Sequence, residues 1–176
     1  MAIVTNKQRT HNALLLKQES NIYVALGGTS PWPDEANPTS PSASTTTINK
    51  LIYLKKINLK HMVEETDIYD PYSVPDVTVD GIDYTYIPDA NVYTENTKKI
   101  YLSATINFGD IAPIDTTFRI VGLCINPEDV YGNILTGTEY LAASVDSIGE
   151  LLWLDNIEAV TRDASQQEKF EIIINF

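Results

Sequence analysis

Short apolar runs separated by turn residues constrain the fold of this chain more than any other feature. In the clearest run, between residues 100 and 108, every second residue is apolar: Ile100, Leu102, Ala104, Ile106 and Phe108. A period of two is typical of a strand with one buried face. Residues 118–125 are almost continuously apolar, which predicts a central strand buried on both faces. We therefore expect sheets to dominate the fold.

Other strands are expected at 22–26, 51–59, 151–154 and 170–176. Between the runs 77–79 and 82–84, the pair Asp80 and Gly81 predicts a hairpin. Asp-Gly supplies the positive φ angles that a type I′ turn requires. About seven to nine strands with turns between them favour a β-sandwich or a barrel-like domain. At 176 residues the chain suits a single domain, residues 1–176.

One helix is expected, at about residues 6–18. Thr5 and Gln8 stand three residues apart ahead of an apolar stretch, which is the capping-box pattern. Residues 13–16 are expected to supply the buried stripe of this helix.

The segment 29–47 holds four prolines among Ser and Thr. Because proline fixes φ and lacks a backbone N–H, this segment is predicted to be one long loop.

The charge of the chain is divided unevenly. Residues 1–33 hold three Lys or Arg and one acid, hence a charge of +2, whereas residues 34–176 carry −14. Two tracts, 61–97 and 120–161, contain nine and seven acids and neither Lys nor Arg. A basic helical end on an acidic body indicates a handle that docks onto an acidic surface, such as a second copy.

Composition excludes several classes of function. A pI near 4.4 argues against nucleic-acid binding, which needs clustered Lys and Arg. The chain has no apolar run of about 18 residues, so membrane insertion is not expected. Its first residues do not form a signal peptide. The single cysteine, Cys124, excludes an internal disulfide and any multi-cysteine metal site.

No constellation predicts catalysis, a cofactor or a metal. The pairs Glu64-Glu65 and Glu128-Asp129 are adjacent, and adjacent residues of a strand point to opposite faces. The second pair is expected at the start of a helix or turn. Neither His11 nor His61 has a partner at metal-ligand spacing. Four aspartates lack the spacing of a calcium loop, although a loose surface calcium site stays open: Asp76, Asp80, Asp83 and Asp89.

The motif Pro31-Trp32-Pro33 is the most distinctive part of the long loop. Tryptophan is enriched at the centres of interfaces, and flanking prolines reduce the entropy lost on docking. The alternative is that Trp32 packs on its own core and fastens the loop, and both interpretations stay open here. The candidate interface residues are therefore Lys7 and Arg9 on the basic helix, and Pro31 and Trp32 in the loop.

Several short segments occur in a familiar order. They are Ala2-Ile3-Val4-Thr5 with Lys7 and Arg9, Gly27 before Pro31-Trp32, Phe118-Arg119 with Asn126-Pro127, and the stretches 149–156 and 167–176. In these segments the chain resembles the baseplate wedge proteins of contractile-tailed bacteriophages, typified by wedge protein eight of the T-even phages. It is much shorter than that member and departs from it in the middle, without its large inserted domain.

This resemblance implies a mainly β homodimer with no enzymatic activity and no cofactor. Such proteins bridge neighbouring wedge subunits in the virion tail, after assembly in the host cytoplasm. Two other functions remain open from the residues. Ten tyrosines suit a tail-associated receptor- or carbohydrate-binding β-sandwich module. An acidic hydrolase would need two carboxylates that converge in a cleft with perturbed pKa values.

Overall fold

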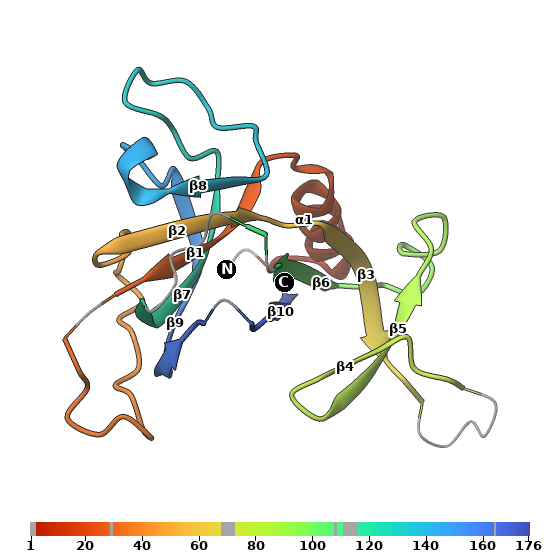
Figure 1. Cartoon of the computed structure of the whole chain (residues 1–176). Helices are drawn as coiled ribbons and strands as arrows, with labels where there is room; N and C mark the ends of the chain where they lie inside the picture. The colour runs from red at the N-terminus through yellow and green to blue at the C-terminus, as the bar shows by residue number, and fades with distance from the viewer. Residues whose placement is uncertain (1–2, 29, 68–72, 108, 111–115, 164) are drawn as a thin grey trace. The chain divides into compact units, whose positions relative to one another are not determined.

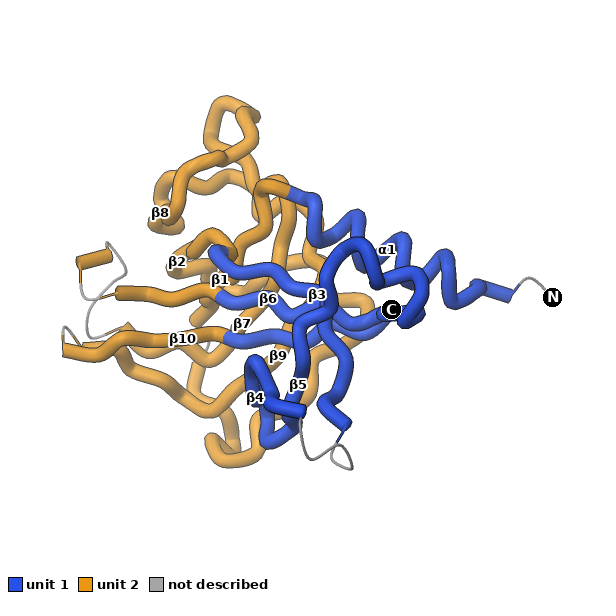
Figure 2. The backbone as a smooth tube through the Cα atoms, turned by 90° about the vertical axis from the view of Figure 1, so that its right-hand side faces the viewer, with its two compact units in different colours: residues 1–19, 58–103, 171–176 blue, residues 20–57, 104–170 orange. Residues whose placement is uncertain are grey.

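The computed structural model describes residues 3–28, 30–67, 73–107, 109–110, 116–163 and 165–176. The chain forms two compact units, coloured separately in Figure 2. Unit 1 comprises residues 1–19, 58–103 and 171–176, and unit 2 comprises residues 20–57 and 104–170. The expectation of a single domain stays a prediction.

The helix α1 of unit 1 runs over Asn6–Gln18, as predicted. Thr5 is its N-cap, and the Thr5 hydroxyl accepts a hydrogen bond from the Gln8 backbone N–H at 3.2 Å. The reciprocal bond of a capping box, from the Thr5 backbone N–H to the Gln8 side-chain oxygen, is not formed; Gln8 Nε2 donates to Asn12 Oδ1. The expectation of a buried stripe at 13–16 is corrected: Ala13 and Leu16 are buried with Thr10, whereas Leu15 is 52% exposed.

The sheet of unit 1 has the strand order β10-β6-β3-β5-β4. These strands are β3 (Leu59–Glu65), β4 (Val77–Val79), β5 (Ile82–Ile87), β6 (Lys99–Ile106) and β10 (Glu168–Asn175). The last residues of β6 and the first of β10 belong to unit 2. The predicted hairpin is confirmed: Asp80 and Gly81, between β4 and β5, have φ angles of 51° and 78°.

The sheet of unit 2 has the order β8-β2-β1-β7-β9 (Figure 1). It consists of β1 (Ile22–Gly27), β2 (Leu51–Lys56), β7 (Thr117–Ile125), β8 (Glu139–Leu141) and β9 (Glu150–Thr161). A short 3₁₀ turn, Ala142–Ser144, follows β8. Strand β7 lies between β1 and β9 and is buried along most of its length, which confirms the predicted central strand.

Two strand predictions need correction. The run 51–59 is not one strand, because Ile57 and Asn58 separate β2 from β3 and the two strands join different sheets. The strand expected to be half-buried at 100–108 is buried on both faces, since Tyr101 and Ser103 are as inaccessible as their apolar neighbours. Phe108, the last residue of that prediction, lies outside the described residues.

The mainly β class with one α-helix is confirmed: the described residues form ten strands in two antiparallel sheets and one α-helix. In unit 2 the core gathers around Tyr23, Leu54 and Leu123, which are fully buried. In unit 1 it gathers around Val63 and Tyr101. Among the residues that the structure describes, no helix is long and apolar enough to cross a membrane.

Candidate interface surfaces

The long loop of unit 2 is fastened to its own unit through Trp32. The indole Nε1–H donates to the Ile157 carbonyl at 3.0 Å, and the ring packs against the core of unit 2. Trp32 is half-buried, whereas Pro31 is exposed. Burial of an indole with its N–H satisfied is a strongly favourable contact. These contacts agree with the interpretation in which Trp32 fastens the loop to its own unit.

Glu35 links the loop to strand β7. Its Oε1 accepts from the Trp32 backbone N–H at 3.1 Å and from Arg119 Nε at 2.9 Å. Arg119 faces a bulge in β9: its neighbours Phe118 and Ile120 pair with residues four apart in β9. The ion pair is partly shielded, with 14% of the Arg119 side chain exposed. A charge-assisted bond in this setting holds the start of the loop to the sheet.

The other end of the loop is held by Ile48. A Cβ built on Gly27 would lie 2.5 Å from Ile48 Cγ2, and one built on Gly122 would lie 2.6 Å from its Cδ1. The two glycines lie on neighbouring strands, so together they leave the space that Ile48 occupies. The loop is thus fixed at both ends, and its middle stays at the surface.

The basic end of α1 is a different kind of surface. Lys7 and Arg9 are both exposed, and Arg9 Nη1 donates to the Phe176 carbonyl at 3.1 Å. The first turn of α1 contains no acidic residue. The N-terminus of a helix carries a partial positive charge, so a cation there is unfavourable by about 0.3–1 kcal/mol. Lys7 therefore gives this helix no electrostatic support.

Three of the four aspartates considered for calcium are bound to neighbouring groups. Asp76 accepts from the Tyr86 backbone N–H at 2.7 Å, and Asp83 accepts from the Thr78 hydroxyl at 2.6 Å. Asp89 pairs with Lys17. No group of three or more potential metal-ligating side chains occurs within the described ranges. Asp76, Asp83 and Asp89 therefore each have a structural partner, and the possibility of a loose surface calcium site stays open.

The Glu128-Asp129 pair begins a turn and not a helix. Asp129 Oδ1 accepts from the backbone N–H groups of Tyr131 and Asn133 at 2.8 and 2.9 Å. Bonds from Asn133 and from the Tyr131 backbone lower the pKa of Asp129, against a small opposing effect of burial. The turn holds Tyr131, which is 86% exposed, at the surface of unit 2.

The carboxyl groups with displaced pKa values do not suit acid catalysis. For Asp110, burial raises the pKa, but the hydrogen bonds from Lys55 and the Asn107 backbone outweigh it and lower the pKa. Hydrogen bonds from the Ser165 side chain and backbone lower the pKa of Asp163. A general acid at neutral pH needs the opposite displacement. In the described part of the chain, every displaced carboxyl pKa is displaced downward.

His61 and Cys124 both pack against neighbouring residues within the fold. The His61 ring stacks on Tyr86, with centroids 4.0 Å apart. Burial and then the charge of Lys17 lower the pKa of His61, against Asp76 and Asp89. His11 is exposed. Burial raises the pKa of the Cys124 thiol to about 12, so Cys124 packs as a small apolar residue.

The structure therefore separates the four candidate residues into two surfaces. Lys7 and Arg9 lie on unit 1, and Pro31 and Trp32 lie on unit 2. The sequence did not single out two further features, the exposed Tyr131 turn and the free edge of β9. The Asn-Pro-Glu-Asp sequence before Tyr131 signalled the turn, but its exposure depends on the surrounding fold.

Comparison with known proteins identifies the family of this chain. A family described as "Baseplate wedge 3 tail fiber network component" matches residues 1–176. "Virion protein 3" of Enterococcus phage phiEF24C is 33% identical over 175 residues, which is 98% of this chain and 94% of that protein. The chain belongs to the baseplate wedge 3 tail fiber network component family.

Membership in this family indicates a structural role in a phage tail and a place in the virion. It is also consistent with a protein that is not an enzyme. The expected membership among baseplate wedge proteins is supported at this level. The narrower likeness to wedge protein eight of the T-even phages is not confirmed and stays a prediction.

Proposed function

We propose that this protein is a structural component of a contractile-tail baseplate wedge and bridges neighbouring wedge subunits as a homodimer. The observation that carries the proposal is the basic start of α1. Lys7 and Arg9 are exposed at a helix end whose dipole opposes them. A charge that weakens its own helix and touches solvent is well placed to meet an acidic partner.

The composition of the body supplies the complementary surface. Residues 34–176 carry a charge of −14. In the proposed contact, the basic end of one copy meets acidic surface on a second copy or on another wedge protein. Opposite charges accelerate association and set its orientation more than they raise affinity, which suits an assembly that must later rearrange. The proposal involves no cofactor, nucleic acid or membrane insertion, and places assembly in the host cytoplasm.

Charge reversal tests this proposal. In the double variant Lys7→Glu, Arg9→Glu, light scattering is expected to show weaker association. Added salt is expected to weaken the association of the unaltered chain in a similar way, because salt screens the same charges. Lys50→Glu is the control for Lys7→Glu, because Lys50 is an exposed lysine of unit 2. An oligomer mass that stays the same in the double variant would contradict the proposal.

One observation favours a tail-associated receptor- or carbohydrate-binding module as a second function. Tyr131 presents a largely exposed ring on a turn that Asp129 holds in place. Aromatic faces of this kind stack on sugars. However, four of the tyrosines are buried in the core: Tyr23, Tyr53, Tyr84 and Tyr101. Binding on a glycan array that Tyr131→Ala abolishes would establish this function, and a blank array would leave the structural role.

A further inference from the structure

A groove runs beside the outer edge of β9. Strand β9 is the last strand of its sheet and pairs only with β7 among the described strands. Four consecutive β9 residues, 151–154, form one wall of a groove of about 300 Å³. The facing wall consists of loop residues Pro41, Ser42, Ala43 and Thr45. Both walls belong to unit 2.

The loop wall contains a hydrogen-bonded turn. The Thr45 backbone N–H donates to the Ser42 carbonyl at 2.9 Å, and the Ser42 hydroxyl is 2.9 Å from that of Ser44. The Asn156 side chain donates to the Thr39 carbonyl and ties the loop to β9 just beyond the groove. Contacts of Trp32 and Asn156 thus attach the loop to β9 outside the groove.

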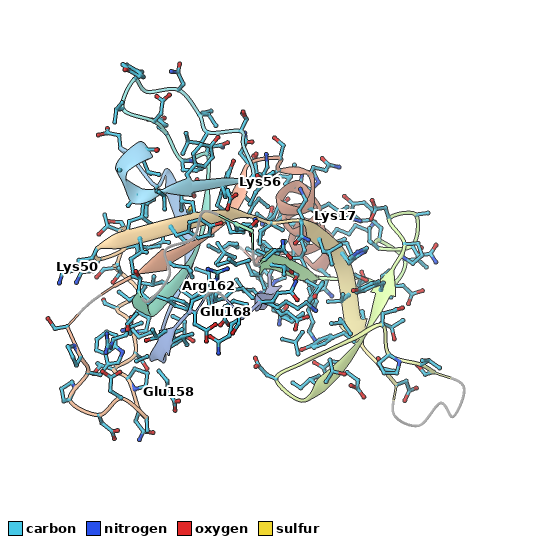
Figure 3. All side chains as sticks on the ribbon, in the orientation of Figure 1. Lys17, Lys50, Lys56, Glu158, Arg162 and Glu168 are labelled. Carbon is cyan, nitrogen blue, oxygen red and sulfur yellow. The ribbon has the colours of Figure 1, made fainter. Side chains whose placement is uncertain are left out.

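The chemistry of the β9 wall suits an extended peptide. An edge strand presents backbone N–H and C=O groups that no neighbouring strand uses, and a partner strand can pair with them. The apolar residues of this wall differ in exposure: Leu152 is 37% exposed, whereas Leu151 and Leu154 pack against the core of unit 2. Both ends of the wall are acidic, since Glu150 precedes it and Asp155 follows it, and both are exposed. The exposed Glu158 lies farther along β9 (Figure 3).

The chain carries a segment with matching chemistry. Ile3 and Val4 precede α1 and are 84% and 57% exposed. Thr5, the N-cap of α1, has an extended backbone, with φ −78° and ψ 158°. β-branched side chains favour strand pairing. Lys7 follows two residues later, so a paired segment brings a cation to whichever acidic end of the groove it approaches.

We propose that residues Ile3–Thr5 of a second copy add a strand to the free edge of β9, inside this groove. Lys7 of that copy then meets Glu150 or Asp155, depending on the strand direction. The inference rests on the homodimer proposed above and names the contact that forms it. Backbone pairing supplies the attachment, and the acidic ends select a basic arm over an acidic one.

Disulfide trapping between two different chains tests the contact. One full-length chain carries Val4→Cys and the other carries Leu152→Cys, and the two are mixed under mild oxidation. Cys124 does not compete, because it is buried with a raised thiol pKa. The control pairs Val4→Cys with Ile82→Cys, since Ile82 is 45% exposed and Leu152 is 37% exposed. The first pair is expected to form covalent heterodimer at least about tenfold faster than the control.

Two results would overturn the inference. One is an equal rate of heterodimer formation for the two pairs. The other is a chain with both Val4→Cys and Leu152→Cys that closes a disulfide within itself at low concentration, because the arm would then belong to its own chain.

A proline variant separates this contact from the homodimer in general. Val4→Pro removes a backbone N–H from an exposed position outside every element, whereas Val4→Thr keeps both the N–H and the strand preference. Light scattering is expected to show weaker association for the proline variant alone. If Lys7→Glu weakens the dimer and Val4→Pro does not, the dimer stands and the arm contact fails. If the unaltered chain does not associate, both fail.

Discussion

The proline-rich loop and the basic end of α1 were the two surfaces singled out from the sequence, and they are held in opposite ways. The loop is long and irregular, yet Trp32, Glu35 and Ile48 tie it to the core of its own unit. The helix is regular and well capped, yet Lys7 is exposed and opposes the helix dipole.

The two regions make it possible to examine stability and association separately. A tryptophan with its N–H satisfied and its ring packed stabilises its own unit, whatever else contacts it. Lys7, at the positive end of its own helix, gives that helix no electrostatic support, and we propose that it serves a contact with a partner. We therefore expect substitutions in the loop to change the free energy of unfolding, and substitutions of Lys7 to change association.

Among these substitutions, Trp32→Ala is expected to have the largest effect on stability. Loss of the half-buried ring should lower the free energy of unfolding by about 2–4 kcal/mol. Urea denaturation measures this, with the exposed Tyr131→Ala as the control that leaves it nearly unchanged. Trp32→Phe should cost less, because it loses the bond to Ile157 but keeps most of the ring contact. A Trp32→Ala chain as stable as its parent would show that the loop is not anchored there.

Glu35→Gln acts on the same loop and is expected to have a smaller effect on stability. The substitution leaves the shielded Arg119 without its ionic partner, and we expect a loss of about 1–2 kcal/mol. A double-mutant cycle with Arg119→Gln isolates the pair. Coupling energy near zero would mean that the ion pair does not fasten the loop.

Thr5→Ala addresses the helix side. Removal of the hydroxyl leaves the Gln8 backbone N–H without its cap, which typically costs about 1 kcal/mol. Thr5→Ser keeps the cap and serves as the control. The free energy of unfolding decides the outcome, and equal losses for Ala and Ser would mean that the cap does not act through its hydroxyl.

Lys7→Glu is expected to have the smallest effect on stability and to reverse its sign. An acid in the first turn favours the helix dipole, so the free energy of unfolding should rise by about 0.3–1 kcal/mol. Association should fall in the same protein. A variant that is both less stable and less associated would remove the separation between the two regions.

Local chemistry explains which features of the fold were predictable from sequence. The bounds of α1 follow from the Thr5 cap and the composition of one segment. The β4–β5 hairpin follows from the positive φ angles that Asp80-Gly81 supplies. In both places a few neighbouring residues decide the conformation, so tertiary contacts do not change the outcome.

Features that depend on distant partners were not predictable. Residues 51–59 read as one apolar run, and only the pairing of β2 with β1 and of β3 with β6 separates them into two sheets. Tyr101 and Ser103 are buried by neighbours that alternation does not reveal. The place of Trp32 depends on Ile157, which is 125 residues away in the chain. The groove beside β9 likewise exists only because a distant loop lies along that strand.

Electron cryomicroscopy of the assembled phage tail would show what surrounds Lys7 and Arg9 in the assembly. The account predicts that the chain lies in the baseplate, with Lys7 and Arg9 of each copy against acidic side chains of a neighbouring subunit. A tail in which these two residues face solvent in every copy, or a baseplate that lacks the chain, would contradict it.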